Sequence, residues 1–282
     1  MSMTLEELFD GITSGIQEKI NEATERINNQ TNNPQFIFFL FNSLTEELLT
    51  KNPTIYTLTQ LLINSIIKSK WRNTYNNVTS IYWPDEIKQN IALTLLNAVF
   101  SIPNQQRMHF IEPLIYIIKN EFPNVSYILK PLNAQYSENI ANALDVNTFL
   151  FIATPFSKLF NQRLITQNYK NELLEEIESK IFLTTFNAIQ MYISQISKLD
   201  ESCSIIYNCL KIIRYSTLDM DRLLLYPAFY QTLQQIFNII LIDSNESPII
   251  NIKIQIYKLI IFLNSTFLTR RMKIKTENRN KF

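Results

Sequence analysis

Hydrophobic residues recur every three or four positions along most of this 282-residue chain, with polar residues between them. That spacing places the hydrophobic side chains on one face of an amphipathic helix. Prolines and polar runs such as Asn29 to Asn33 interrupt the pattern and mark helix ends. The predicted helices are residues 5–27, about 35–50, 54–71, about 84–102, one that opens at Pro103, 123–132, and about 138–162, 171–198, 201–218, 222–242 and 249–268.

The last of these segments admits two interpretations. Its sequence IINIKIQIYKLII alternates apolar and polar residues as a strand does, yet its apolar residues also fit one helical face. A single strand with no hairpin signal elsewhere would leave its backbone groups unpaired, so we expect a helix. The residues of that helical face are Ile249, Ile252, Ile256, Leu259 and Leu263.

Many helices joined by short loops predict an all-α fold. With 46% hydrophobic and 12% aromatic residues, the chain can bury a substantial core. The composition has no strong break along the sequence, which favours one series of paired helices stacked side by side. We therefore expect an α-solenoid in preference to a closed bundle.

Composition also argues against several functional classes. Gly11 and Gly15, both within the first helical pattern, are the only glycines, so none is left for a phosphate-binding loop or a nucleophile elbow. A net charge of +1 with scattered basic residues does not favour nucleic acid as a partner. The acidic N-terminal segment is unlike a secretory signal, and no apolar run reaches the length of a membrane span. We expect a cytosolic or nuclear protein, with Cys203 and Cys209 too differently oriented on one helix to form a disulfide.

Candidate catalytic groups are few. His109 is the only histidine and lacks partners for a metal site or a triad, so we expect it at a solvated position or a helix end. Acidic clusters could supply carboxylates for acid–base chemistry, but solvated helix faces are far more common, and nothing in the sequence brings two clusters to one pocket. These clusters are Glu46-Glu47, Asp85-Glu86, and Glu172 with Glu175, Glu176 and Glu178. We expect no enzyme activity, cofactor or metal, and the terminal RRMKIK fits either a localisation or nucleic-acid tag or a solvated tail.

Two stretches resemble one known family. ATERINNQTNNPQFIFFLFNSL and the following LLINSIIKSKW resemble the N-terminal module of the importin-β superfamily of nuclear transport receptors, at Ala23, Ile27, Asn33, Pro34, Phe36 and Trp71. WPDEIKQNIALTLLNAVFSIPNQQRMHFIEPLIYIIKNEFPNVSYIL is similar, without a gap, to the second and third repeats of the importin-seven/eight and exportin-two branch. The matching residues there are Pro84, Ile91, Ala98, Pro103, Arg107, Ile117, Ile118, Lys119, Phe122 and Pro123. The similarity is strong at about 20–130 and faint downstream, at IYNCLKIIRYSTL and IKIQIYKLIIFLNSTFL.

The resemblance implies a HEAT-repeat solenoid, a right-handed superhelical stack of antiparallel helix pairs. It implies an importin-β N-terminal-like domain at 1–133, further HEAT-like repeats of the same solenoid at 134–270, and a basic C-terminal tail at 271–282. The residues expected at the seams between repeats are Pro34, Phe36, Trp71, Pro84, Pro103, Arg107, Phe122 and Pro123.

The resemblance also implies a function. In this family the N-terminal repeats recognise the small GTPase Ran in its GTP-bound form, and binding is coupled to cargo capture or release. We expect inner helices at about 35–50, 84–102 and 123–132, and Ran contacts at Glu46, Glu47, Asp85, Lys88, Gln89 and Asn97. Cargo proteins and nucleoporins are further expected partners, in the cytoplasm, in the nucleus and at the pores of the nuclear envelope.

The chain also departs from the family pattern. Asn64-Ser65 replaces Lys-Asn before the tryptophan, Ala92 replaces an arginine, and Ser126 replaces a tryptophan. Karyopherins are several times longer and usually acidic. The alternative is therefore a truncated or divergent HEAT-type scaffold that binds some other protein and does not bind Ran.

Overall fold

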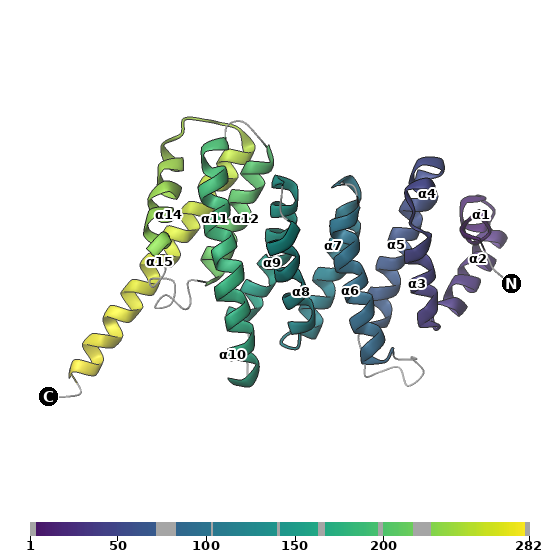
Figure 1. The fold of residues 1–282 in the computed structure, drawn as a ribbon, viewed down its shortest axis with the longest axis horizontal. Helices are drawn as coiled ribbons and strands as arrows, with labels where there is room; N and C mark the ends of the chain where they lie inside the picture. Colours follow the sequence, from purple (N-terminus) through teal and green to yellow (C-terminus); the bar gives the residue numbers. More distant parts are fainter. Residues whose placement is uncertain are drawn as a thin grey trace. The chain divides into compact units, whose positions relative to one another are not determined.

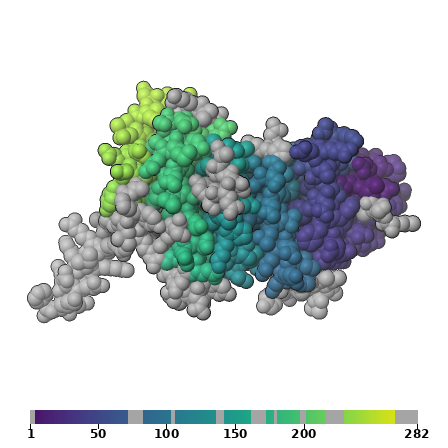
Figure 2. Space-filling model, viewed as in Figure 1, coloured from purple at the N-terminus to yellow at the C-terminus, as the bar shows by residue number. Residues whose placement is uncertain are grey.

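The computed structural model describes residues 4–71, 83–102, 104–139, 142–162, 167–196, 200–216 and 227–279. Every regular element in these ranges is helical, which confirms the predicted all-α class (Figure 1). The chain folds into two compact units, residues 1–120 and 121–282. Within each unit, side chains fill the space between neighbouring helices (Figure 2). The domain boundary expected at residue 133 follows the limit of a resemblance and stays a prediction.

The N-terminal pattern forms two helices, α1 (Leu5–Thr13) and α2 (Gln17–Gln30). The prediction of one helix here was wrong, because Gly15 takes a φ of 72° and ends the helical path between them. The apolar periodicity continues across this break, so it gave no sign of the turn. Gly11 allows the two helices to lie close, since a Cβ at this position would come within 2.7 Å of the Ala23 Cβ.

The next predicted helix, about 35–50, is also two helices, α3 (Pro34–Ser43) and α4 (Glu46–Lys51). Leu44 leaves the helical conformation with a ψ of 72°. Thr45 then begins α4, because its hydroxyl accepts a 3.1 Å hydrogen bond from the backbone N–H of the helix's third residue. The Thr45 cap therefore sets a helix boundary that the hydrophobic spacing did not indicate.

Three longer helices complete the first unit. They are α5 (Pro53–Lys70), α6 (Asp85–Ser101) and α7 (Asn104–Glu121). Pro84 caps α6 from outside instead of lying in its first turn. Pro103, which was expected to open α7, lies outside the described residues.

The first unit has two layers of helices. α3 contacts both α5 and α6. α5 and α7 lie side by side and run parallel. Asn64 of α5 donates a hydrogen bond to Glu112 of α7. One turn further along both helices, the Tyr116 hydroxyl of α7 donates a hydrogen bond to the Lys68 carbonyl of α5. Two helices that alternate along the sequence therefore lie side by side and run in the same direction.

The second unit continues with longer helices. In chain order these are α8 (Ser126–Asn139), α9 (Ala143–Gln162), α10 (Gln167–Glu176), α11 (Leu183–Tyr192), α12 (Asp200–Ser216), α14 (Pro227–Asn238) and α15 (Ser247–Arg279). A π-helical segment, η1 (Ile177–Phe182), joins α10 to α11, and 3-10 turns η2 (Ile193–Gln195) and η4 (Ile239–Leu241) follow α11 and α14.

Two predictions for this unit have clear outcomes. Pro123 does not open α8, because Pro123 to Val125 form a turn and the Val125 carbonyl accepts the first N–H groups of the helix. The segment that alternated like a strand is helical and forms α15, as context had indicated. α15 continues through Arg279, so the backbone of most of the expected basic tail belongs to this helix. The side chains of that segment lie outside the described part of the chain.

The helices α9, α12 and α15 contact one another in series and run parallel. Asn147, early in α9, accepts a 3.1 Å hydrogen bond from Ser204, early in α12. Later in both helices, the Lys158 ammonium lies 5.9 Å from the centre of the Tyr215 ring. α12 and α15 also run parallel, because Ser204 near the start of α12 lines one pocket with Ser247 at the start of α15. Further along both helices, Arg214 donates a 3.1 Å hydrogen bond to Gln255.

The other helices of this unit form a second series, in which α8 contacts α10 and α11 contacts α14. Lys130 and Asn133 of α8 bond to Glu172 and Glu176 of α10, so these two helices also run parallel. The second unit therefore has two layers, one of α9, α12 and α15, and the other of α8, the continuous segment α10–η1–α11, and α14.

Candidate protein-binding surface

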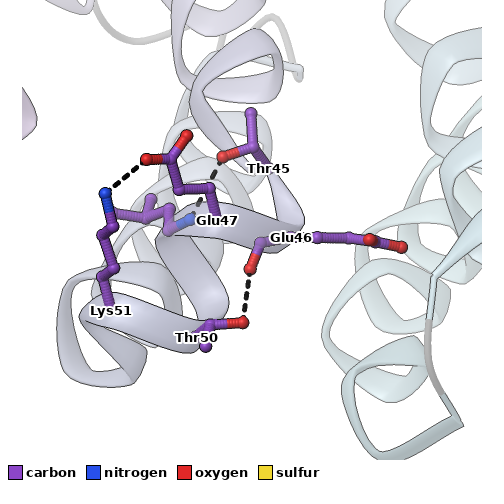
Figure 3. A network of polar contacts seen from close by, with 6 residues as sticks. Thr45, Glu46, Glu47, Thr50 and Lys51 are labelled. Carbon is purple, nitrogen blue, oxygen red and sulfur yellow. Dashed lines mark hydrogen bonds and ion pairs between the residues drawn. The ribbon is translucent and has the colours of Figure 1, made fainter.

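The α4 helix carries the first two predicted Ran contacts, Glu46 and Glu47, and both are exposed. They occupy the first turn, where the backbone N–H groups favour negative side chains. Glu47 forms an ion pair with Lys51 one turn later, whereas the Glu46 side chain extends away from that pair (Figure 3). The Thr50 hydroxyl donates a 2.8 Å hydrogen bond to the backbone carbonyl of Glu46. The Glu46 side chain itself is exposed.

A cavity of ≈ 470 Å³ lies beside α4, between the start of α1 and the end of α3. Glu6, Glu47 and Lys51 line its wall, with Glu47 and Lys51 paired to each other, and the partly exposed Phe39 adds an apolar surface. A wall that combines apolar surface with charged groups of both signs suits an amphipathic protein segment. The sequence did not indicate this cavity, because its walls come from α1, α3 and α4, which the hydrophobic spacing does not place side by side.

The α6 helix carries the other four predicted contacts. Asp85 and Gln89 are exposed on one side of its first turns, and Asn97 is exposed near its end. Lys88 is half-buried, and its ammonium lies 5.8 Å from the centre of the Trp71 ring, a cation–π contact. The six candidate residues therefore form two groups, because α4 packs on α5 whereas α6 packs on α3.

The residues expected at repeat seams have different positions. Phe36, Trp71, Arg107 and Phe122 are buried, as expected of packing residues. Pro34 begins α3, Pro84 precedes α6 and is exposed, and Pro123 is half-buried in the turn before α8. Arg107 stabilises the connection within one helix pair, since its Nε donates a 3.2 Å hydrogen bond to the Ile102 carbonyl at the end of α6.

A polar network that the sequence did not reveal joins α5 to α7. Glu112 accepts hydrogen bonds from Lys68 at 2.7 Å and from Asn64 at 3.0 Å, one on each carboxylate oxygen. The hydrogen bond from Lys68 is the main cause that lowers the pKa of Glu112, partly opposed by desolvation. The partners are more than forty positions apart, so only the topology brings them together.

Two departures from the family pattern have a structural role of their own. Asn64 takes part in the Glu112 network and is largely buried. Ala92 is fully buried in α6, so its small side chain fits a position where the family has an arginine. Ser126 begins α8 and is half-buried.

The acidic cluster of the second unit binds neighbouring helices. Glu172 accepts a 2.7 Å hydrogen bond from Lys130, which lowers the pKa of Glu172 and raises the pKa of Lys130. Glu176 accepts one of 2.8 Å from Asn133, and Glu175 is exposed. The side chain of Glu178 lies outside the described residues. These carboxylates therefore hold α10 on α8 instead of meeting across a pocket.

The remaining candidates are placed as follows. His109 is half-buried within α7 and not at a helix end. Cys203 and Cys209 are buried, and they form no disulfide, as predicted. In the described part of the chain, no group of three or more His, Cys, Asp and Glu residues is placed to hold a metal ion. Within the same ranges, no helix combines the length and apolar character needed to cross a membrane. No protein-family model matches the chain, and neither does any curated protein.

Proposed function

We propose that the chain is a protein-binding module built from HEAT-like helix pairs, and that its first unit binds the small GTPase Ran in its GTP-bound form in nucleocytoplasmic protein transport. One observation carries the proposal. Most of the residues on which the importin-β resemblance rests occupy packing positions, as residues that define a fold should, while Asn33, Pro84 and Lys119 are exposed. Nine of the matching residues are 7% exposed or less: Ala23, Ile27, Phe36, Trp71, Ile91, Arg107, Ile117, Ile118 and Phe122.

The arrangement of helices supports the repeat part of the proposal. In an up-and-down bundle of four helices, the helices in contact are antiparallel and parallel helices face each other diagonally. Here parallel helices that alternate along the sequence bond directly, as α5 does with α7 and α8 with α10. Stacked helix pairs produce this contact pattern, because equivalent helices of successive pairs lie next to one another.

Surface chemistry supports the partner part of the proposal. Glu46 presents an uncompensated carboxylate at the start of α4, and Asp85 and Gln89 present polar groups at the start of α6. Exposed charges of one sign steer an oppositely charged partner and raise its association rate. The family's N-terminal repeats contact a region of Ran that changes shape with the bound nucleotide, so binding should depend on that nucleotide.

A scaffold that binds a different protein is the second candidate. It is favoured by the positions at which the chain departs from the family. Asn64 and Ala92 are committed to contacts inside the first unit, so they are not available to a partner. In this case the same helix pairs would bind a protein other than Ran through their exposed faces.

A titration of the full chain with Ran tests the proposal. We expect micromolar or tighter binding of Ran carrying a non-hydrolysable GTP analogue, and binding at least about tenfold weaker with GDP. Glu46→Lys should weaken the GTP-dependent binding, whereas Glu18→Lys, a change of the same charge on exposed α2, should not. Equal affinity for both nucleotide states, or no binding at high micromolar concentration, would contradict the Ran assignment and favour the scaffold.

A further inference from the structure

The helix α15 has two apolar faces, only one of which is covered. Its inner face is buried and packs on α12; its members are Ile249, Ile252, Ile256, Leu259 and Leu263. The outer stripe, as we call the second face, is formed by Ile250, Ile254, Tyr257 and Ile261, which are between 39% and 68% exposed. Four large apolar side chains in one exposed row on one helix indicate an interaction surface.

The spacing of the outer stripe is that of a helix seam. Its members follow one another at intervals of four, three and four residues, which corresponds to heptad positions d, a, d and a. In this register Ile252 and Leu259 of the inner face occupy f positions, on the opposite side of the helix. A partner helix would therefore pack on the outer stripe without displacing α12.

The packing within the second unit indicates the same occupant. α9 packs on α12, and α12 packs on α15, so each helix of this layer is covered by the next (Figure 1). α15 is the last of the series within the described ranges. Its outer stripe faces away from α12, so it offers the next helix the kind of contact that α12 and α15 already make.

The charges beside the stripe indicate the chemistry of that helix. Lys253 and Lys258 take the flanking g and e positions, and the sequence contains no Asp or Glu from residue 247 to 265. The Lys253 ammonium also donates a hydrogen bond to the Ile242 carbonyl at the end of η4. The preceding residue, Leu241, is the most exposed large apolar side chain among the described residues and extends the apolar surface there.

We propose that the outer stripe docks an amphipathic helix of another polypeptide, one with apolar residues in its own heptad seam and Asp or Glu at the flanking positions. Such a helix would bury the stripe and pair mainly with the exposed Lys258, because the Lys253 ammonium already donates to the Ile242 carbonyl. A second copy of α15 fits poorly, because in a parallel pair Lys253 of one helix would face Lys258 of the other. Tyr257 at the centre supplies an aromatic anchor of the type found in the middle of interfaces.

Two synthetic helical peptides test the proposal on the full chain. Both have leucine at a and d, and one has glutamate and the other lysine at e and g. In fluorescence anisotropy we expect the acidic peptide to bind at least about tenfold more tightly than the basic one. Ile254→Ser with Tyr257→Ser should abolish binding, and Lys258→Glu should reverse the order of preference or bring the two affinities close together. These positions are exposed, and unchanged circular dichroism would show that the variants remain folded.

Matched controls make the remaining outcomes informative. Met191→Ser removes an equally exposed apolar side chain from α11 and should leave the affinity unchanged. No binding of the acidic peptide, equal affinity for both peptides, or an equal loss in Met191→Ser would overturn the proposal. Self-association of the chain that Tyr257→Ser removes would assign the stripe to a second copy. Binding to vesicles of phosphatidylcholine and phosphatidylserine, in place of the peptide, would assign it to a lipid surface.

Discussion

Lys68 of α5 donates a 2.7 Å hydrogen bond to Glu112 of α7, forty-four positions along the chain. The carboxylate of Glu112 also accepts a hydrogen bond from Asn64, so a single side chain joins two turns of α5 to α7. Both charged groups are substantially exposed, which limits the ion pair itself to roughly 0.2–1 kcal/mol. Its contribution is mainly to fix the register of the two parallel helices α5 and α7.

Glu112→Gln should therefore lower the stability of the first unit in a pH-dependent way. The folded pKa of Glu112 is depressed, so its stabilisation is present above the unfolded carboxyl pKa of about 4.3 and is lost as the pH falls through the lower folded pKa. Urea unfolding should show the wild type more stable at pH 7, with the difference shrinking toward pH 3. Glu25→Gln on exposed α2 is the control, and a difference that persists unchanged at pH 3 would rule out ionisation as the cause.

Trp71 ends α5 and is only 2% exposed, so its ring is part of the core of the first unit. Trp71→Ala should lower the free energy of unfolding by about 3–5 kcal/mol, the range for truncating a buried aromatic residue. Trp71→Phe should cost clearly less, because it keeps most of the apolar volume. Urea unfolding followed by circular dichroism measures both. A loss below ~1 kcal/mol for the alanine variant would mean that the ring is not buried in solution.

The two glycines differ in what they permit, and substitutions should separate the two effects. Gly11→Ala places a Cβ within 2.7 Å of Ala23 and 2.8 Å of the Lys19 carbonyl, so α1 must move away from α2, at a cost of roughly 1–3 kcal/mol. Gly15 has open space around it, so Gly15→Ala pays only for the left-handed backbone, roughly 1 kcal/mol.

Hydrogen exchange measures both glycine variants locally. Gly11→Ala should increase exchange across residues 5–30 more than Gly15→Ala does, because only the first disrupts packing between two helices. Gly15→Asn serves as the conservative variant, since asparagine tolerates the left-handed region better than alanine. Comparable exchange in Gly11→Ala and wild type would show that α1 and α2 do not pack closely in solution.

The helical class and most helix positions followed from the sequence because apolar side chains must share one face of each helix. Boundaries failed where a single backbone conformation decides them. Gly15 and Leu44 each interrupt a helix without changing the hydrophobic spacing, so the pattern ran through both breaks. The strand-like alternation at 249–261 has a different cause: one helix buries its inner face and exposes an outer stripe of equally apolar residues.

The candidate surface was predictable only in part. Polar residues on an expected helix, such as Glu46 and Asp85, are found exposed because charged groups are rarely buried. The Glu112 network and the cavity beside α4 could not be predicted, since both combine residues from helices that meet only in the folded unit. Lys88 shows a further limit, because its place over the Trp71 ring depends on where α5 ends relative to α6.

The last prediction separates the two glutamates of α4, which the sequence could not distinguish. Glu47 is already paired with Lys51, whereas Glu46 extends away from that pair. If the first unit binds Ran-GTP, Glu46→Lys should reduce the association rate and its dependence on ionic strength, and Glu47→Lys should do so less.

The substitution with the larger effect on stability should be the one with the smaller effect on association. Glu47→Lys removes an i,i+4 ion pair and also places a positive charge in the first helical turn, whereas Glu46→Lys does only the second. Glu47→Lys should therefore be the more destabilising change, by some tenths of a kcal/mol, while Glu46→Lys has the larger effect on association. Stopped-flow association at two salt concentrations, with thermal unfolding of the same samples, measures both orders. Equal effects of the two substitutions on association would mean that α4 acts through its overall charge and not through the outward carboxylate of Glu46.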